Sequence, residues 1–197
     1  MTLLIGAYFF LIALILALLE IQIEGPHGWA EKLPTWRWDG PAVRRWFGKP
    51  VTGYHVCLVT LILLFLHVPQ LHGGSWKREA DLLAMFFLLT VTWDFLWFAC
   101  NRHFGVGRFR KGQIWWFPAW TLGVPRPYLL AIALSLCAGL APALWTGEWA
   151  GRAWLWGIVS SELLVLTIAV TAFTLRPRRR DRAVSRSVQG AGKVKPK

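Results

Sequence analysis

Several ionisable side chains of this chain occur inside or beside strongly apolar stretches, and these are the residues that could do chemistry. Asp94 is the clearest case, because it lies in an apolar run that continues to Cys100, about two helical turns further on. A carboxyl group in hydrocarbon is costly unless it faces the protein interior and finds a partner. Asn101 follows Asp94 by seven residues, which places both side chains on one face of a helix. We therefore expect this face to border a polar site inside the protein.

Two further sets of ionisable residues flank the neighbouring apolar runs. Glu20 and Glu24 end the first run, and their spacing of four places them on one helical face. His55 opens the second run, and His103 follows the third. Carboxylates and imidazoles that project between helices build the non-haem metal centres of helix bundles. We therefore hypothesise a divalent-metal site with these candidate ligands: Glu20, Glu24, His55, Asp94 and His103.

The same side chains are suited to general acid–base catalysis on a substrate that enters from the lipid. The residues that we predict to be catalytic are Asp94, His55 and Glu20. A purely structural interpretation stays open, in which Glu20 and Asp94 pair with donors such as Arg102 or His55 and hold helices together. The sequence lacks a compact ligand motif such as H-x-x-x-H, so it does not decide between a metal site and structural pairing.

Glu162 is a second acid within an apolar run, next to Ser160 and Ser161. Ionisable residues inside a membrane are candidates for function by default. A relay between Glu162 and Asp94 would suit a proton-coupled transporter, whereas a hydrogen bond to a neighbouring serine would make Glu162 structural. The chain shows no internal repeat, which argues against transport by a single copy.

These residues must be positioned by helices, because long uncharged runs dominate the chain. Of the 197 residues 55% are hydrophobic and 14 are Trp, which is typical of a multi-pass membrane protein. We predict an all-α bundle of five transmembrane helices in one domain, residues 1–176, followed by a disordered basic tail, residues 177–197. The predicted spans cover residues 2–23, 53–71, 81–100, 127–145 and 153–175.

The connector between the first two spans carries signals for short interfacial helices. Pro41 suits the first position of a helix and Gly48 suits its end. Such a helix has an apolar side and a basic side, as expected in the headgroup layer. An earlier apolar stripe, Trp29, Leu33 and Trp36, predicts another short helix, although Pro34 falls inside it. The alternative is a loop folded over the bundle.

The basic residues predict how the chain crosses the membrane. With five spans, 19 of the 22 Lys and Arg residues fall on one side, together with the tail. The positive-inside rule then places the N-terminus outside and the C-terminus in the cytoplasm of an inner membrane. The net charge of +12 lies beside apolar runs, so we expect anionic lipid headgroups as partners and no nucleic acid.

The sequence therefore predicts an integral inner-membrane protein with a carboxylate–histidine cluster at its cytoplasmic face. The activity that this cluster favours is that of a small membrane-embedded enzyme acting on a lipid or another hydrophobic substrate. Two alternatives remain: an accessory or scaffold subunit of a membrane complex, and a small oligomeric proton-coupled transporter. Either alternative would require a membrane protein partner or a homo-oligomer.

Overall fold

The computed structural model describes residues 2–146 and Glu162, and this part of the chain is mostly helical. Three of its helical stretches are long and apolar enough to cross a membrane: Gly6–Glu24, Gly53–His72 and Trp76–Cys100. A shorter apolar helix, Arg126–Pro142, coincides with the fourth predicted span. The fifth predicted span, 153–175, and the tail, 177–197, lie outside the described residues, with Glu162 as the exception.

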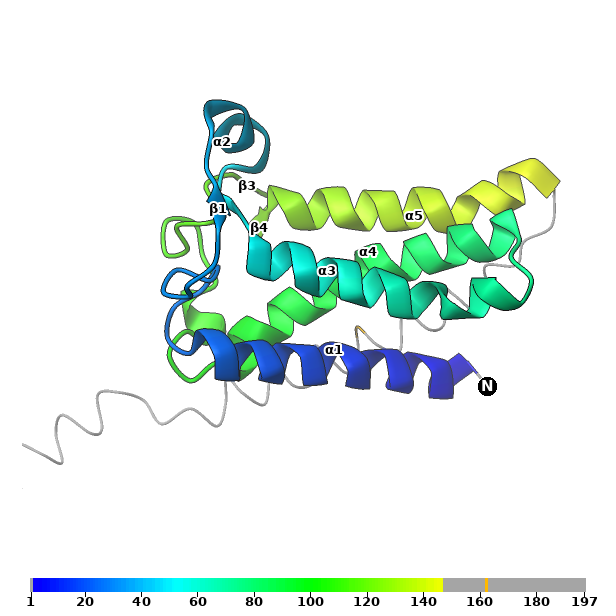
Figure 1. Ribbon diagram of the computed structural model, residues 1–197, viewed down its shortest axis with the longest axis horizontal. Helices are drawn as coiled ribbons and strands as arrows, with labels where there is room; N and C mark the ends of the chain where they lie inside the picture. Colours follow the sequence, from blue (N-terminus) through cyan, green and yellow to red (C-terminus); the bar gives the residue numbers. More distant parts are fainter. Residues whose placement is uncertain (1, 147–161, 163–197) are drawn as a thin grey trace, which may run out of the picture.

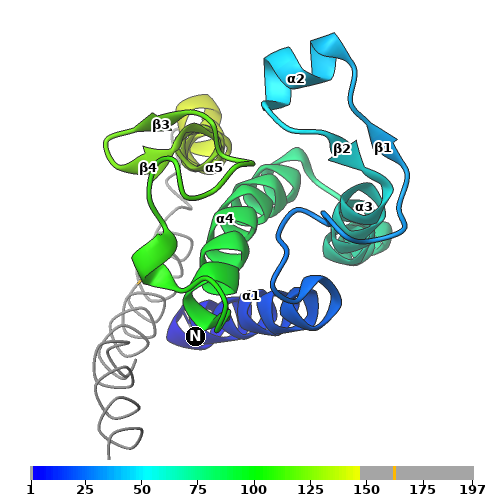
Figure 2. The ribbon, with the colours of Figure 1, turned by 90° about the vertical axis from the view of Figure 1, so that its left-hand side faces the viewer.

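The described bundle is organised around one central helix, α4. Its long helices are α1 (Thr2–Glu24), α3 (Gly53–His67), α4 (Trp76–Cys100) and α5 (Arg126–Thr146). Figures 1 and 2 show α4 running between α1 and α5, with which it makes its most extensive contacts. Leu89, Leu96 and Phe98 of α4 are fully buried. The hydrophobic core therefore lies along α4.

The ends of α3 and α4 are set by local signals rather than by apolar content alone. The Ser75 side chain accepts a hydrogen bond from the Arg78 amide at 3.3 Å, so α4 begins at Trp76 rather than at residue 81. At the other boundary α3 continues into a short 3₁₀ helix, Val68–His72, in which Pro69 lies in the first turn. The predicted second span, 53–71, therefore corresponds to an α-helix with a 3₁₀ extension.

α3 is attached to the rest of the protein mainly through its first turn. Of its 15 residues only Gly53 is buried. Just before it, strand β2 (Val51–Thr52) pairs antiparallel with β1 (Arg37–Trp38), and the Gly53 amide donates to the Trp36 carbonyl at 3.0 Å. A Cβ at Gly53 would lie 2.2 Å from the Trp36 indole nitrogen, so this close approach requires glycine.

The connector between α1 and α3 contains one of the two predicted short helices. Helix α2 (Pro41–Phe47) begins and ends as expected, with Gly48 in the left-handed conformation at its end. The helix predicted from the stripe at residues 29–36 is wrong: turns run from Trp29 to Lys32, and Trp29 and Ala30 have positive φ. Figure 1 shows α2 beyond the bundle, at the end where α1 stops and α3 begins.

The segment between α4 and α5 folds back onto the same end of the bundle. It holds a 3₁₀ turn, Val106–Arg108, and a second strand pair, β3 (Trp120–Thr121) with β4 (Val124–Pro125). Trp116 and Phe117 are buried in the core, and the Trp116 ring stacks on Phe98 with centroids 5.9 Å apart. Neither strand pair was predicted. The fold is therefore mostly helical rather than purely so, with small pairs that hold the connectors.

Candidate functional site

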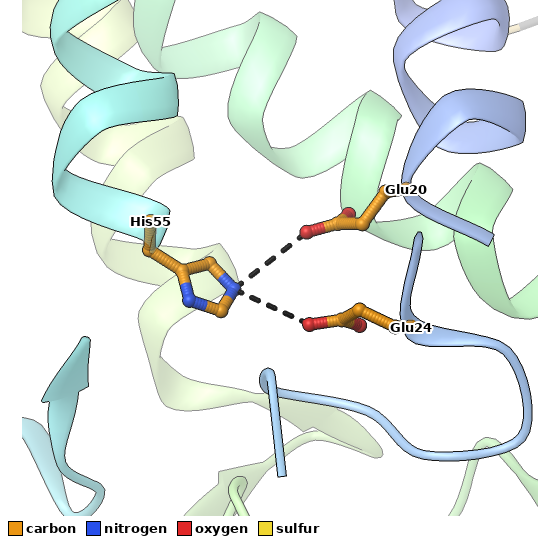
Figure 3. Close-up of side chains that lie close together, drawn as sticks. All are labelled: Glu20, Glu24 and His55. Atoms are coloured by element: carbon orange, nitrogen blue, oxygen red, sulfur yellow. Dashed lines mark ion pairs between the residues drawn. The ribbon is translucent and has the colours of Figure 1, made fainter. Parts of the chain in front are cut away.

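Glu20, Glu24 and His55 lie together where the C-terminal end of α1 meets the N-terminal end of α3. Figure 3 shows both carboxylates pointing at the imidazole. His55 Nε2 is 3.6 Å from Glu20 Oε1 and 3.8 Å from Glu24 Oε1. One donor atom from each residue lies within 4.8 Å of the other two, which within the described chain makes these three residues the one group able to hold a metal ion. The predicted carboxylate–histidine cluster therefore exists for these three residues.

The carboxylate of Glu24 is held by the turn that follows α1. The Ala30 amide donates a hydrogen bond to Glu24 Oε1, the same oxygen that faces His55. This contact depends on the left-handed backbone of Trp29 and Ala30, with φ of 57° and 51°. Such a conformation is uncommon for residues other than glycine, and here it turns the amide toward the cluster. Because Glu24 is almost fully buried, its direction is fixed by this turn.

His55 is oriented by groups on both sides of its ring. Its Nδ1 lies 2.6 Å from Thr52 Oγ1, and the same hydroxyl caps α3 by accepting from the His55 amide. The Trp29 indole stacks on the imidazole with centroids 4.0 Å apart, and its Nε1 donates to the Pro50 carbonyl at 2.7 Å. With Nδ1 engaged, Nε2 is the ring atom that faces the two carboxylates. An imidazole held in this way is ready to act as a metal ligand.

A cavity of about 200 Å³ adjoins the cluster. Its polar lining comes from α1, the connector, α3, α4 and α5: Glu20, Lys49, His55, Asp94 and Tyr128. The remainder is largely apolar and includes Val59 of α3, Val91 of α4 and Ala131 of α5. Elements distant in the sequence thus enclose one space that is polar near the cluster and apolar elsewhere.

Asp94 borders this cavity but is not part of the three-residue cluster. Its Oδ2 accepts a hydrogen bond from the Tyr128 hydroxyl, which joins α4 to α5. The alternative partner considered from the sequence, Arg102, instead donates to the His103 ring at 3.3 Å on the exposed loop. Asp94 therefore belongs to the wall of the cavity and lies outside the group of residues that could share a metal ion.

His103 and Asn101 have a different place from the one expected. The His103 amide donates to Asn101 Oδ1 at 2.9 Å, and Asn101 Nδ2 donates to the Gly25 carbonyl at 3.0 Å. Asn101 is completely buried, so it fastens the end of α4 to the end of α1. The His103 ring is not among the residues that could share a metal ion. The geometry thus does not bring this candidate ligand to the cluster.

Lys49, like Tyr128, is a cavity residue that the sequence interpretation missed. Its side chain is 9% exposed, and its Nζ lies 3.2 Å from the centroid of a Trp29 ring and 4.6 Å from that of Phe117. Burial lowers the pKa of Lys49 to about 7, although the nearby carboxylates oppose this shift. In the sequence Lys49 follows Gly48 and precedes Pro50, which is typical of an exposed loop. Only the packing of distant aromatic residues reveals its burial.

Glu162 contacts α4 at a different position. Thr92 Oγ1 donates to Glu162 Oε1 at 3.2 Å. Thr92 and Asp94 are two residues apart, so their side chains leave the helix about 200° apart. The two acids thus contact different sides of α4, and Thr92 is the described partner of Glu162. A direct proton relay between Glu162 and Asp94 gains no support from these contacts.

The fold and the cluster together indicate a candidate membrane protein with a possible metal-binding group. Its described part is mostly helical, has three helices that could cross a membrane, and carries a buried carboxylate–histidine group at one end of the bundle. Comparison with known family models, curated proteins and solved structures finds no match to this chain. The chemistry of the site must therefore be inferred from its own geometry.

Proposed function

We propose that this protein is a membrane-embedded enzyme with a divalent metal ion held by Glu20, Glu24 and His55. Its substrate would be a lipid or another hydrophobic molecule in the adjoining cavity. The observation that carries the proposal is the convergence of three buried donor atoms from α1 and α3 within 4.8 Å. Two carboxylates and an imidazole rarely meet in a buried site without a cation or a shared proton.

Two of the three separations between donor atoms are short enough for a shared ion, and all three lie within 4.8 Å. A transition metal such as zinc binds imidazole nitrogen and carboxylate oxygen at roughly 2.0–2.2 Å. Two donors can therefore share one ion when they are up to about 4.2 Å apart, twice the upper limit of that range. The separations of 3.6 Å and 3.8 Å from His55 Nε2 to the two carboxylates satisfy this condition. Mixed nitrogen and oxygen donors suit zinc, iron or manganese.

The charges around the cavity also favour a divalent cation. Glu20, Glu24 and Asp94 contribute three negative charges in their ionised forms, and Lys49 contributes one positive charge. The sum is −2, which a divalent ion would balance. Because unbalanced charge in a buried site is strongly unfavourable, a bound divalent ion would favour the ionised forms of these carboxylates.

The protein's own groups suggest how a bound substrate would be handled. A metal ion with three protein ligands polarises a substrate oxygen or lowers the pKa of a bound water molecule. Thr52 holds the His55 ring so that Nε2 keeps its direction. Asp94, held by the Tyr128 hydroxyl, presents a carboxyl group to the same cavity and is placed to accept or return a proton there.

The exposure of α3 supports a hydrophobic substrate. The cavity lies against Val59 of α3 and Ala131 of α5, and α3 is exposed along most of its length. In a membrane these exposed apolar surfaces would face lipid. A molecule dissolved in the bilayer would therefore meet the apolar part of the cavity before it reached the polar end.

Metal analysis of the purified full chain tests the proposal. We expect about one equivalent of zinc, iron or manganese per chain, lost in Glu20→Gln and His55→Gln. The matched control is His67→Gln, because His67 bonds Glu79 at 2.9 Å in the α3–α4 hairpin, away from the cluster. If wild type bound no more metal than a folded His55→Gln variant after loading with each ion, the metal-centre proposal would be wrong.

We further propose an inner-membrane location with the N-terminus outside and the candidate site near the cytoplasmic surface. The support is the distribution of Lys and Arg along the chain, which the positive-inside rule translates into an orientation. On this orientation the exposed Trp46 and Phe47 of α2, next to Arg44 and Arg45, would contact anionic headgroups. A periplasmic signal from a reporter fused after Lys197 would overturn the orientation.

A further inference from the structure

Lys49 is a buried cation that the metal centre does not use. In the described chain it makes no ion pair within 4.0 Å, and its ammonium group instead lies over the rings of Trp29 and Phe117. Aromatic faces attract a cation, but they do not replace the hydrogen bonds that an ammonium group makes in water. Lys49 thus has donors to offer to whatever enters the cavity that it lines.

The backbone on both sides of Lys49 is held in place by packing, and this packing keeps the Lys49 side chain buried. Gly48 ends α2 with φ of +70°, and a Cβ there would lie 2.6 Å from the Pro118 ring. Pro50 follows, and its carbonyl accepts the hydrogen bond from Trp29 Nε1. Both neighbours of Lys49 are therefore packed against other segments, and the side chain is directed inward.

The apolar part of the cavity limits what this lysine can bind. Val59, Val91 and Ala131 line the space beyond the polar end. A small hydrophilic anion would leave these surfaces unmatched, whereas the first carbons of an acyl or glycerol chain would cover them. The combination of one ammonium donor and apolar walls fits an amphiphile with a negatively charged oxygen group at its end.

We propose that the cavity binds a lipid with an anionic oxygen head group, whose phosphate or carboxylate accepts hydrogen bonds from Lys49 Nζ. This inference rests on the proposed function, since it names the class of substrate for the same site. The proposal is also consistent with the charges of the groups that line the site. A divalent ion and Lys49 together balance the three carboxylates, so an anionic head group enters a site of no net charge.

The experiment measures binding of short-chain lipids to the full chain in a neutral detergent, with metal content determined on the same samples. The probes are dioctanoyl phosphatidic acid, octanoic acid, uncharged dioctanoylglycerol and inorganic phosphate. The variants are Lys49→Met, which removes the charge, and Lys49→Arg, which keeps it. Lys111→Met is the matched control, because Lys111 lies on the exposed surface of the loop before α5.

We expect wild type to bind at least one of the two anionic lipids at least tenfold more tightly than dioctanoylglycerol. Lys49→Met should lose this preference with its metal content unchanged, while Lys49→Arg and Lys111→Met should keep it. Because a buried ammonium group is replaced by a side chain of similar length, Lys49→Met should fold, and its thermal transition in detergent verifies this.

Three results would overturn the inference: equal binding of charged and uncharged lipids, an anionic preference that survives in folded Lys49→Met, or inorganic phosphate binding as tightly as either anionic lipid. With one equivalent of metal still present, each would remove the lipid assignment and leave the metal centre standing. Conversely, a Lys49-dependent preference in a chain that holds no metal would support the lipid site and contradict the metal centre.

Discussion

Thr52 offers a sharp test of the metal centre, because it touches the cluster only through His55. Its Oγ1 lies 2.6 Å from His55 Nδ1 and 3.4 Å from the His55 amide, and the residue is fully buried. Thr52→Val keeps the volume of the side chain and removes the hydroxyl. Thr52→Ser keeps the hydroxyl and removes the methyl group. The pair therefore separates orientation of the imidazole from packing.

The expected magnitudes differ for metal binding and for stability. Loss of a hydrogen-bonded group behind a metal-ligating histidine typically weakens metal binding about 10- to 100-fold, or roughly 1.4–2.7 kcal/mol. The capping bond to the His55 amide is long, so its loss should cost about 0.5–1 kcal/mol, the low end for helix caps. Thr52→Ser should lower stability by about 1 kcal/mol through the lost methyl group and leave metal affinity near that of wild type.

Metal affinity is measured by competition with a chromophoric chelator, and stability by thermal unfolding of the metal-free protein in detergent. Nitrogen NMR of labelled histidine adds a direct readout, because Thr52→Val should change the tautomer balance of His55. If Thr52→Val bound metal within twofold of wild type, the hydroxyl would not orient a ligand. The argument that His55 is held ready for a metal would then fail.

Three further outcomes follow from the structure. Asn101→Ala should destabilise the protein by about 1–3 kcal/mol, since it leaves the half-buried Gly25 carbonyl and the His103 amide without these hydrogen bonds; a loss below about 0.5 kcal/mol in detergent unfolding would contradict this. Gly53→Ala should cost about 1–3 kcal/mol because its Cβ would meet the Trp36 ring, whereas Gly107→Ala, with open space around it, serves as the control. Finally, in metal-free wild type the buried Lys49 has a pKa of about 7 against an ordinary value of 10.5, so the unfolded chain binds more protons between these values. Stability should therefore rise with pH across this interval, by up to about 1.4 kcal/mol per pH unit, and the advantage of Lys49→Met over wild type should be largest below pH 7 and shrink above it. A stability gap that does not change with pH would show that Lys49 is not buried as a cation.

The elements that the sequence predicts correctly are those with strong local signals. Helix α2 is an example, because Pro41 favours a helix start and Gly48 favours a left-handed stop wherever the segment packs. The helix predicted at residues 29–36 is the opposite case. There an apolar stripe with helical spacing is overridden by Pro34 and by contacts with Glu24 at the end of α1 and with His55 of α3. Two-residue strands such as β1 and β2 have no periodicity that could reveal them.

In the candidate site, too, some features could be predicted from the sequence and others could not. Glu20 and Glu24 share a helix face by spacing, and counting spans places His55 at the same end of the bundle, so their proximity can be predicted. The partners of Asp94 and the burial of Lys49 cannot, because both depend on the path of the segment between α4 and α5. That segment brings Phe117 to Lys49, and it sets the position at which α5 begins, where Tyr128 meets Asp94. Counting spans says which end a residue occupies, but not which neighbour it meets.

Trp29 connects the two halves of the cavity, and this explains an otherwise unfavourable backbone. One face of its indole is packed on His55, its Nε1 fixes the Pro50 carbonyl, and the ammonium group of Lys49 lies against its ring. Gly28 precedes it where a Cβ would lie 2.1 Å from the Trp116 ring, so the Trp116 side chain can approach the backbone here only because residue 28 is glycine. Left-handed conformations at non-glycine residues cost of order 1–3 kcal/mol each and persist only where the surroundings impose them. Here the imposed turn places one aromatic side chain against both the proposed metal ligand, His55, and the proposed lipid-binding lysine, Lys49.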